Sequence, residues 1–108
     1  MTKITFYKEN GKFTGYSFEG HACFNTKGPD IVCAALSMAS QMTANSLEEL
    51  TDACVATESY DGLFALEITH ECDDEKVQLL IESLYLAVMN LYEQYPDYMT
   101  LSRVGWSE

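Results

Sequence analysis

The sequence predicts an α+β (mixed α/β) fold, in which two helices pack on a mostly antiparallel sheet and the elements follow the order ββαββαβ. Three features predict it: an Asn-Gly pair between two β-rich stretches, an alanine-rich apolar segment, and a later segment whose apolar residues recur three and four positions apart. The chain has 108 residues, 47% of them hydrophobic, which is enough for one domain with a buried core. We therefore expect residues 1–108 to form a single domain.

The first hairpin is predicted by Asn10-Gly11, which stands between the β-rich stretches 4–7 and 13–18. Both central residues of a type I′ turn need positive φ, which asparagine and glycine adopt readily. The second stretch changes phase part of the way along, which indicates a bulge at Gly15.

The first helix is predicted over residues 31–45, a segment that is apolar on nearly every side. Pro29 and Asp30 precede it, and these residue types suit a first turn and an N-cap. A helix that is apolar all round is typically buried, so we expect this helix to be buried.

Two weaker strands are predicted over residues 52–59 and 63–70. Asp61-Gly62 is a plausible turn between them. Partial alternation in the second strand indicates that one of its faces is apolar.

The second helix has the strongest periodicity in the chain, with apolar residues three and four positions apart from Val77 to Tyr95. Acidic residues 73–75 precede it, where the positive end of a helix dipole favours negative charge. Pro96 ends the helix, and residues 98–104 alternate as a last strand.

The net charge of −11, from 6 basic and 17 acidic side chains, excludes several classes of partner. Proteins that bind nucleic acid or anionic membranes need clustered lysine and arginine, whereas the basic residues here are spread along the chain. We expect no direct binding to nucleic acid or membrane. A negatively charged protein attracts basic partners, and ribosomal proteins are one such class.

The N-terminal residues lack the apolar core of a secretory signal, and no apolar run approaches the roughly 18 residues of a membrane span. We therefore expect a cytoplasmic protein. In that compartment cysteines are usually thiols. The four cysteines are Cys23, Cys33, Cys54 and Cys72.

Cys33 is expected in the first turn of the first helix, where unsatisfied N–H groups and the helix dipole favour a thiolate. A thiolate is the nucleophilic form of cysteine, and the same N–H groups could bind an oxyanion. An inert cysteine packed in an alanine-rich helix is the alternative, which position alone favours.

His21 follows the second stretch, between the small residues Gly20 and Ala22. Imidazole titrates near neutrality, so it can accept a thiol proton and return it to a leaving amine. A structural histidine is an equally common alternative. Of the two histidines, His21 is the better candidate over His70, because a folded-back loop would bring it to the helix start.

Two polar residues accompany this pair. Asp30 could orient His21 or contact substrate, although capping alone would explain it. Ser37 stands four residues after Cys33 and therefore on the same helix face, where a packing or hydrogen-bonding role is the simpler interpretation.

A zinc site is the rival hypothesis. His21 and Cys23, and likewise His70 and Cys72, form an H-x-C pattern, and four such ligands would suit tetrahedral zinc. The spacing matches no common zinc motif, so we expect no metal and no cofactor.

The tripeptide GHA at 20–22 and the run DIVCAALS at 30–37 resemble the signature of the ribosomal-processing cysteine proteases, the Prp family. Twelve positions separate His21 from Cys33, which is similar to the family spacing. The resemblance covers nearly the whole chain, but Cys23 is not part of the signature.

The resemblance implies a cysteine endopeptidase with Cys33 as nucleophile and His21 as general base. The other matching motif positions, which we expect to support the site or bind substrate, are Gly20, Ala22, Asp30 and Ser37. The implied substrate is large-subunit ribosomal protein twenty-seven, which loses an N-terminal extension after an aromatic pair. The resemblance also implies a homodimer, and a loop between histidine and cysteine that closes over the substrate.

Two other functions remain open from the residues alone. A non-catalytic module that binds basic ribosomal proteins would keep its function after Cys33→Ala. A zinc-stabilised structural domain would bind about one zinc per chain and unfold with a chelator.

Overall fold

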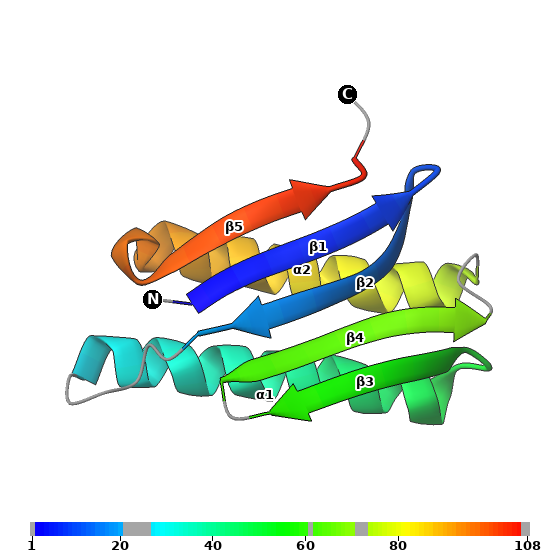
Figure 1. Cartoon of the computed structure of the whole chain (residues 1–108), viewed down its shortest axis with the longest axis horizontal. Helices are drawn as coiled ribbons and strands as arrows, with labels where there is room; N and C mark the ends of the chain where they lie inside the picture. Colours follow the sequence, from blue (N-terminus) through cyan, green and yellow to red (C-terminus); the bar gives the residue numbers. More distant parts are fainter. Residues whose placement is uncertain (1, 21–26, 61, 71–73, 107–108) are drawn as a thin grey trace.

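The computed structural model describes residues 2–20, 27–60, 62–70 and 74–106, and of residues 27–30 it describes the backbone. The elements are β1 (Thr2–Glu9), β2 (Lys12–Glu19), α1 (Lys27–Leu50), β3 (Cys54–Tyr60), β4 (Leu63–His70), α2 (Glu75–Gln94), a 3-10 helix (Pro96–Tyr98) and β5 (Met99–Val104). This order confirms the predicted α+β fold (Figure 1).

The five strands form one sheet in the order β3-β4-β2-β1-β5. The pairs β1–β2, β2–β4 and β3–β4 are antiparallel, and β5 lies parallel to β1 at one edge. The sheet is therefore mostly antiparallel, as predicted.

The first turn is the predicted one. Asn10 and Gly11 have φ values of 55° and 79°, the left-handed conformation that a type I′ turn requires.

The predicted bulge is also present. Tyr7 on β1 pairs with Gly15 on β2, but the next residue, Lys8, pairs with Phe13. Thr14 is therefore the extra residue beside Gly15, and the register change explains why the apolar residues of β2 are out of phase.

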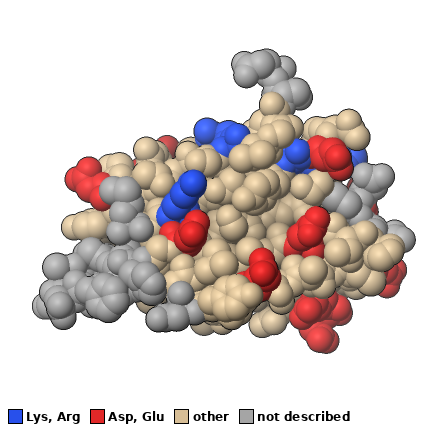
Figure 2. Space-filling model, viewed as in Figure 1, with Lys and Arg blue, Asp and Glu red and all other residues tan. Residues whose placement is uncertain are grey.

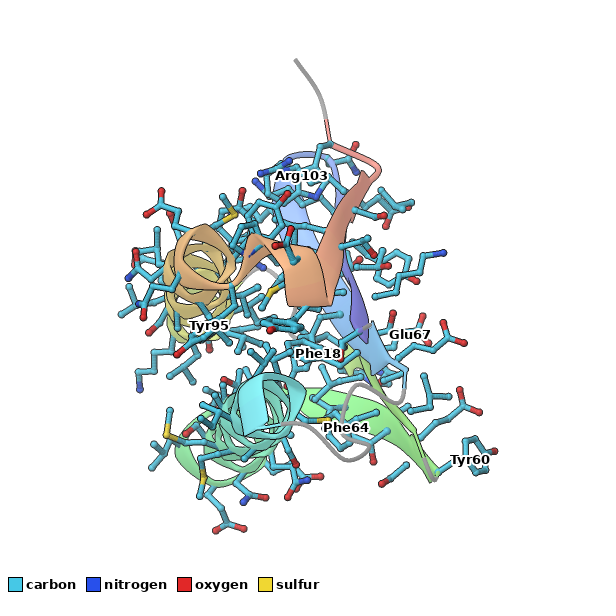
Figure 3. All side chains as sticks on the ribbon, turned by 90° about the vertical axis from the view of Figure 1, so that its left-hand side faces the viewer. Phe18, Tyr60, Phe64, Glu67, Tyr95 and Arg103 are labelled. Atoms are coloured by element: carbon cyan, nitrogen blue, oxygen red, sulfur yellow. The ribbon has the colours of Figure 1, made fainter. Side chains whose placement is uncertain are left out.

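Both helices cover the same face of the sheet, as the end-on view in Figure 3 shows. The alternating residues Ile4 and Phe6 of β1, and Tyr16 and Phe18 of β2, point to this face and are buried. The core between sheet and helices also contains Val32, Leu36 and Leu47 of α1, and Val77, Ile81, Leu84 and Val88 of α2. The other face of the sheet is open to solvent.

The start of α1 differs from the prediction. The helix begins at Lys27, four residues earlier than expected, and runs to Leu50. Pro29 is its third residue, in the first turn, where a missing N–H breaks no helical hydrogen bond. Asp30 therefore lies inside the helix, and the prediction that Asp30 is the N-cap was wrong.

The expectation that α1 is buried on all sides was also wrong. Its outer side exposes Ile31, Met38 and Met42, with exposed fractions of 55%, 69% and 59%. The physical reason is the layer arrangement, because α2 packs beside α1 and leaves its outer side uncovered.

The second half of the chain follows the prediction closely. The acidic N-terminus of α2 is confirmed, since the Asp74 carboxylate accepts a 2.7 Å hydrogen bond from the backbone N–H of Lys76. Beyond α2, the indole of Trp106 donates to the Phe6 carbonyl at 3.2 Å and ties the described C-terminal end to β1.

Candidate active site

Cys33 lines a cavity of about 190 Å³. The chain segments that surround it meet at the left-hand end of the molecule in Figure 1. The start of β1, the end of β2 and the β3–β4 turn meet the N-terminal half of α1 there. The described residues that line it are Thr2, Phe18, Gly20, Cys33, Leu36, Ser37, Ser40, Gln41, Ser59, Tyr60, Gly62, Leu63 and Phe64.

Apolar packing sets the position of α1 over this cavity. Val32 and Leu36 are buried, with exposed fractions of 0% and 3%. Phe18 and Phe64 lie on the side of the sheet that faces the helices, and both line the cavity (Figure 3). Cys33, next to Val32 in the helix, remains partly exposed.

One hydrogen bond fixes the helix to the sheet directly beside the cavity. The Tyr16 hydroxyl on β2 donates to the Ser40 carbonyl on α1 at 2.8 Å. Burial raises the pKa of Tyr16 above its usual value, so this phenol stays protonated and remains a donor.

Cys33, Ser37 and Gln41 stand four residues apart along α1, and all three line the cavity. The prediction that Ser37 shares a helix face with Cys33 is therefore confirmed. The Ser37 hydroxyl oxygen accepts a 3.0 Å hydrogen bond from the Gln41 amide, and the Ser40 hydroxyl donates to the Ser37 carbonyl at 3.1 Å. These contacts form a polar strip beside the thiol position.

Gly20 brings the end of β2 to the same cavity. Its N–H donates to the Gly62 carbonyl at 2.8 Å, and its φ of 135° is one that residues with a side chain rarely adopt. Of the expected site residues, the structure thus brings together Gly20, Cys33 and Ser37. His21 and Ala22 lie outside the described residues, as does the side chain of Asp30.

The position of Cys33 in the helix differs from the expectation. Because α1 begins at Lys27, Cys33 is the seventh residue and lies beyond the first turn. The unsatisfied N–H groups of a helix belong to its first four residues, and the dipole effect fades beyond the first turn. The expectation that Cys33 lies in the first turn of the helix was therefore wrong.

Cys33 is disulfide-bonded in this structure. Cys54, the other cysteine in the described part of the chain, is a free thiol. The expectation that all four cysteines are thiols was wrong for Cys33.

The zinc hypothesis gains no support from the strand arrangement. Gly20, which precedes the first H-x-C pair, is hydrogen-bonded to Gly62 before the start of β4. His70 stands at the other end of β4, opposite Cys54, eight residues or about 26 Å along the extended chain from Gly62. The described residues contain no group of three metal-binding side chains.

A larger hollow of about 430 Å³ lies on the open face of the sheet and contains none of the expected catalytic residues. Figure 2 shows this face, with acidic side chains mainly over β3 and β4 and basic side chains mainly over β1 and β5. Glu58 and Glu67 line the hollow. No helix in the described part of the chain has the length and apolar character of a membrane span.

Sequence reasoning missed several polar residues of the Cys33 cavity, among them Gln41 and Thr2. Gln41 could have been found, because it continues the four-residue spacing of Cys33 and Ser37. Thr2 is thirty-one positions from Cys33 on another element, and no sequence pattern connects the two.

The family model described as cysteine protease Prp matches residues 1–100 of the chain. Among solved structures, SMU.848 from Streptococcus mutans is 35% identical, with 96% of this chain and 94% of that chain covered and a TM-score of 0.86. No curated protein sequence matches the chain.

Two structures of an essential ribosomal processing protease Prp from S. aureus have the same fold. The one with a covalently linked product peptide is 24% identical and has a TM-score of 0.85, and the one with a substrate peptide is 23% identical and has a TM-score of 0.87. In both comparisons 95% of this chain and 99% of that chain are covered.

Proposed function

The chain belongs to the cysteine protease Prp family and is a cysteine protease, and from this premise we propose that Cys33 is its nucleophile and His21 its general base. The observation that carries the proposal is the position of Cys33. Its side chain lines a cavity that also receives Gly20, the residue directly before His21. A nucleophile and a base must come within hydrogen-bonding reach, and these two segments converge on one cavity.

In the proposed reaction, the Cys33 thiolate attacks the carbonyl carbon of the scissile peptide bond. His21 accepts the thiol proton and returns it to the leaving amine, which breaks the C–N bond and leaves a thioacyl-enzyme. A water molecule, deprotonated by His21, hydrolyses the thioester and restores the thiol. The reduced form of Cys33 is required, because a disulfide sulfur has no thiolate to offer.

The remaining motif residues support this site in the proposal. Ser37 lies on the polar strip of α1 beside Cys33 and is available to a bound peptide. Gly20, with its unusual φ, keeps the residue that follows β2 at the edge of the cavity. Ala22 and Asp30 complete the set as expected supporting or substrate-binding residues.

We propose that the substrate is the N-terminal extension of large-subunit ribosomal protein twenty-seven. The two S. aureus relatives are described as ribosomal processing proteases in complex with a substrate peptide and a product peptide. The charge of −11 suits a basic ribosomal substrate, since opposite charge accelerates encounter. In this proposal residues 1–108 form one protease domain that acts in the cytoplasm as a homodimer.

Cleavage of the host's full-length ribosomal protein twenty-seven tests the proposal. Wild type and Cys33→Ala are incubated with it under reducing conditions, and mass spectrometry locates any cut. One defined N-terminal cut by wild type that is absent with Cys33→Ala supports both nucleophile and substrate. Tight binding by both proteins without a cut would instead indicate a binding module.

The role of His21 needs its own variant. His21→Ala removes the proposed base, whereas His70→Ala removes the other histidine, which stands at the far end of β4. Loss of cleavage with the first and normal cleavage with the second is the expected result. The reverse result would overturn the assignment of the base.

A further inference from the structure

The hydroxyl oxygen of Thr2 has no hydrogen-bond partner, although it is buried. Thr2 is 5% exposed, and among the described residues its Oγ1 is the one buried side-chain oxygen or nitrogen without a partner. Buried polar groups in proteins are nearly always hydrogen-bonded, because an unsatisfied one loses its contact with water and gains nothing in return.

Thr2 belongs to the wall of the Cys33 cavity. Thr2 is the first residue of β1 and has the same parity as Ile4 and Phe6, so it faces the helices. It lines the cavity together with Cys33 and Ser37.

Other hydroxyl groups around the cavity and along α1 each have a hydrogen-bond partner. The hydroxyls of Ser40 and Tyr16 donate to carbonyl oxygens, and Ser37 accepts from Gln41. Thr43 of α1, equally buried at 4% exposure, donates to the Ala39 carbonyl at 2.9 Å. Thr2 differs from these residues because no described residue of the protein supplies a partner for its hydroxyl.

We propose that Thr2 is a substrate-positioning residue, whose hydroxyl hydrogen-bonds a backbone amide group of the peptide bound beside Cys33. This inference rests on the proposed peptidase function of the cavity. A hydroxyl can donate to a peptide carbonyl or accept from a peptide N–H, so it suits backbone recognition that does not depend on the peptide side chain. A valine at this position would fill the same space without an unsatisfied group.

Binding to a non-cleaving protein tests the proposal. A fluorescent peptide with the sequence of the N-terminal extension is titrated against Cys33→Ala alone and in combination with Thr2→Val, Thr2→Ser or Thr5→Val. Thr5 is a matched control, because it is 6% exposed on the same strand but points to the opposite face of the sheet. Reduced protein is used throughout.

Thr2→Val is expected to weaken peptide binding about threefold to tenfold, the value of one hydrogen bond, whereas Thr2→Ser and Thr5→Val bind as their parent does. With Cys33 restored, Thr2→Val is expected to raise KM by a similar factor and to change kcat by less. Urea denaturation is expected to show that Thr2→Val is at least as stable as wild type, which excludes misfolding as the cause.

Equal peptide affinity of Thr2→Val and its parent would overturn the proposal, as would the absence of peptide binding in every variant. The experiment distinguishes failure of the proposed role of Thr2 from failure of the proposed protease function. If wild type cuts the peptide and Thr2→Val binds normally, only the role of Thr2 fails. If wild type does not cut but Thr2→Val binds more weakly and Thr2→Ser does not, the role of Thr2 stands and the protease assignment of this cavity fails.

Discussion

The hydroxyl of Tyr16 on β2 donates a 2.8 Å hydrogen bond to the backbone carbonyl of Ser40 on α1, across twenty-four residues of sequence. Ser40 lines the Cys33 cavity, so this contact couples the helix that carries the thiol to the centre of the sheet. A carbonyl in the middle of a helix already accepts a helical bond, and a second donor from the sheet sets the position of the helix at that turn.

Tyr16→Phe is expected to lower the free energy of unfolding by about 1 kcal/mol, because it removes one buried hydrogen bond and keeps the ring. Urea denaturation followed by circular dichroism measures the change. Tyr7→Phe is the control, since Tyr7 is 37% exposed and should differ from wild type by less than about 0.5 kcal/mol. Equal stability of both variants would contradict a structural role for the Tyr16 hydroxyl.

The same contact predicts that the free energy of unfolding depends on pH in the alkaline range. Burial raises the pKa of Tyr16 above its usual value of 10.0 in the folded protein, so the unfolded chain releases this proton first as the pH rises. The contribution of Tyr16 is therefore fully present below pH 10.0 and decreases above it. The test is the stability difference between wild type and Tyr16→Phe, because every other titratable group is common to the two proteins. This difference should shrink and then reverse sign as the pH is raised from 9 to 11. A pH-independent difference would contradict the prediction.

Gly15→Ala tests the bulge in β2. A Cβ at this position would meet the carbonyl oxygen of Leu66 on the neighbouring strand β4, where neither backbone can easily move. We expect a loss of about 1–3 kcal/mol in the free energy of unfolding, typical of overpacking. Ser17→Ala, two residues along the same strand and face, serves as control. Two variants of similar stability would show that the strands separate more easily than the geometry indicates.

Local signals predicted most of the fold. The turn at Asn10-Gly11, the bulge beside Gly15 and the apolar spacing in α2 depend on residues close in sequence, and all three are confirmed. The burial of α1 could not be predicted this way. Whether its apolar outer side is covered depends on where α2 lies, which is a property of the layers.

The candidate site was predictable in part for the same reason. Cys33 and Ser37 share a helix face that their spacing indicates, and both line the cavity. The predicted start of α1 is four residues too late, because Pro29 and Asp30 are typical of a helix boundary, whereas proline is tolerated throughout the first turn. The prediction therefore places Cys33 about one turn closer to the N-terminal end of the helix than it is in the structure.

Ser37→Ala tests the polar strip beside Cys33. The Ser37 oxygen accepts from Gln41, which leaves the hydroxyl hydrogen available for a bound peptide. We expect kcat/KM to fall about tenfold, while the stability changes by less than about 0.5 kcal/mol because Ser37 is exposed. Ser83→Ala on the exposed side of α2 is the control for substitution of a surface serine. Unchanged kcat/KM would show that Ser37 does not contact the substrate and that its hydroxyl serves only the hydrogen bond with Gln41.

The disulfide of Cys33 predicts that activity depends on reductant. Protein prepared without reductant should not cleave the substrate, and dithiothreitol should restore cleavage together with two more titratable thiols per chain, because a nucleophilic sulfur must be a thiolate. Cys54→Ser should leave this dependence intact, since Cys54 is already a free thiol. Cys23→Ser and Cys72→Ser then identify the partner, because the variant that removes it leaves Cys33 reduced and active without dithiothreitol. Full activity of a preparation whose disulfide is intact by mass spectrometry would exclude Cys33 as the nucleophile.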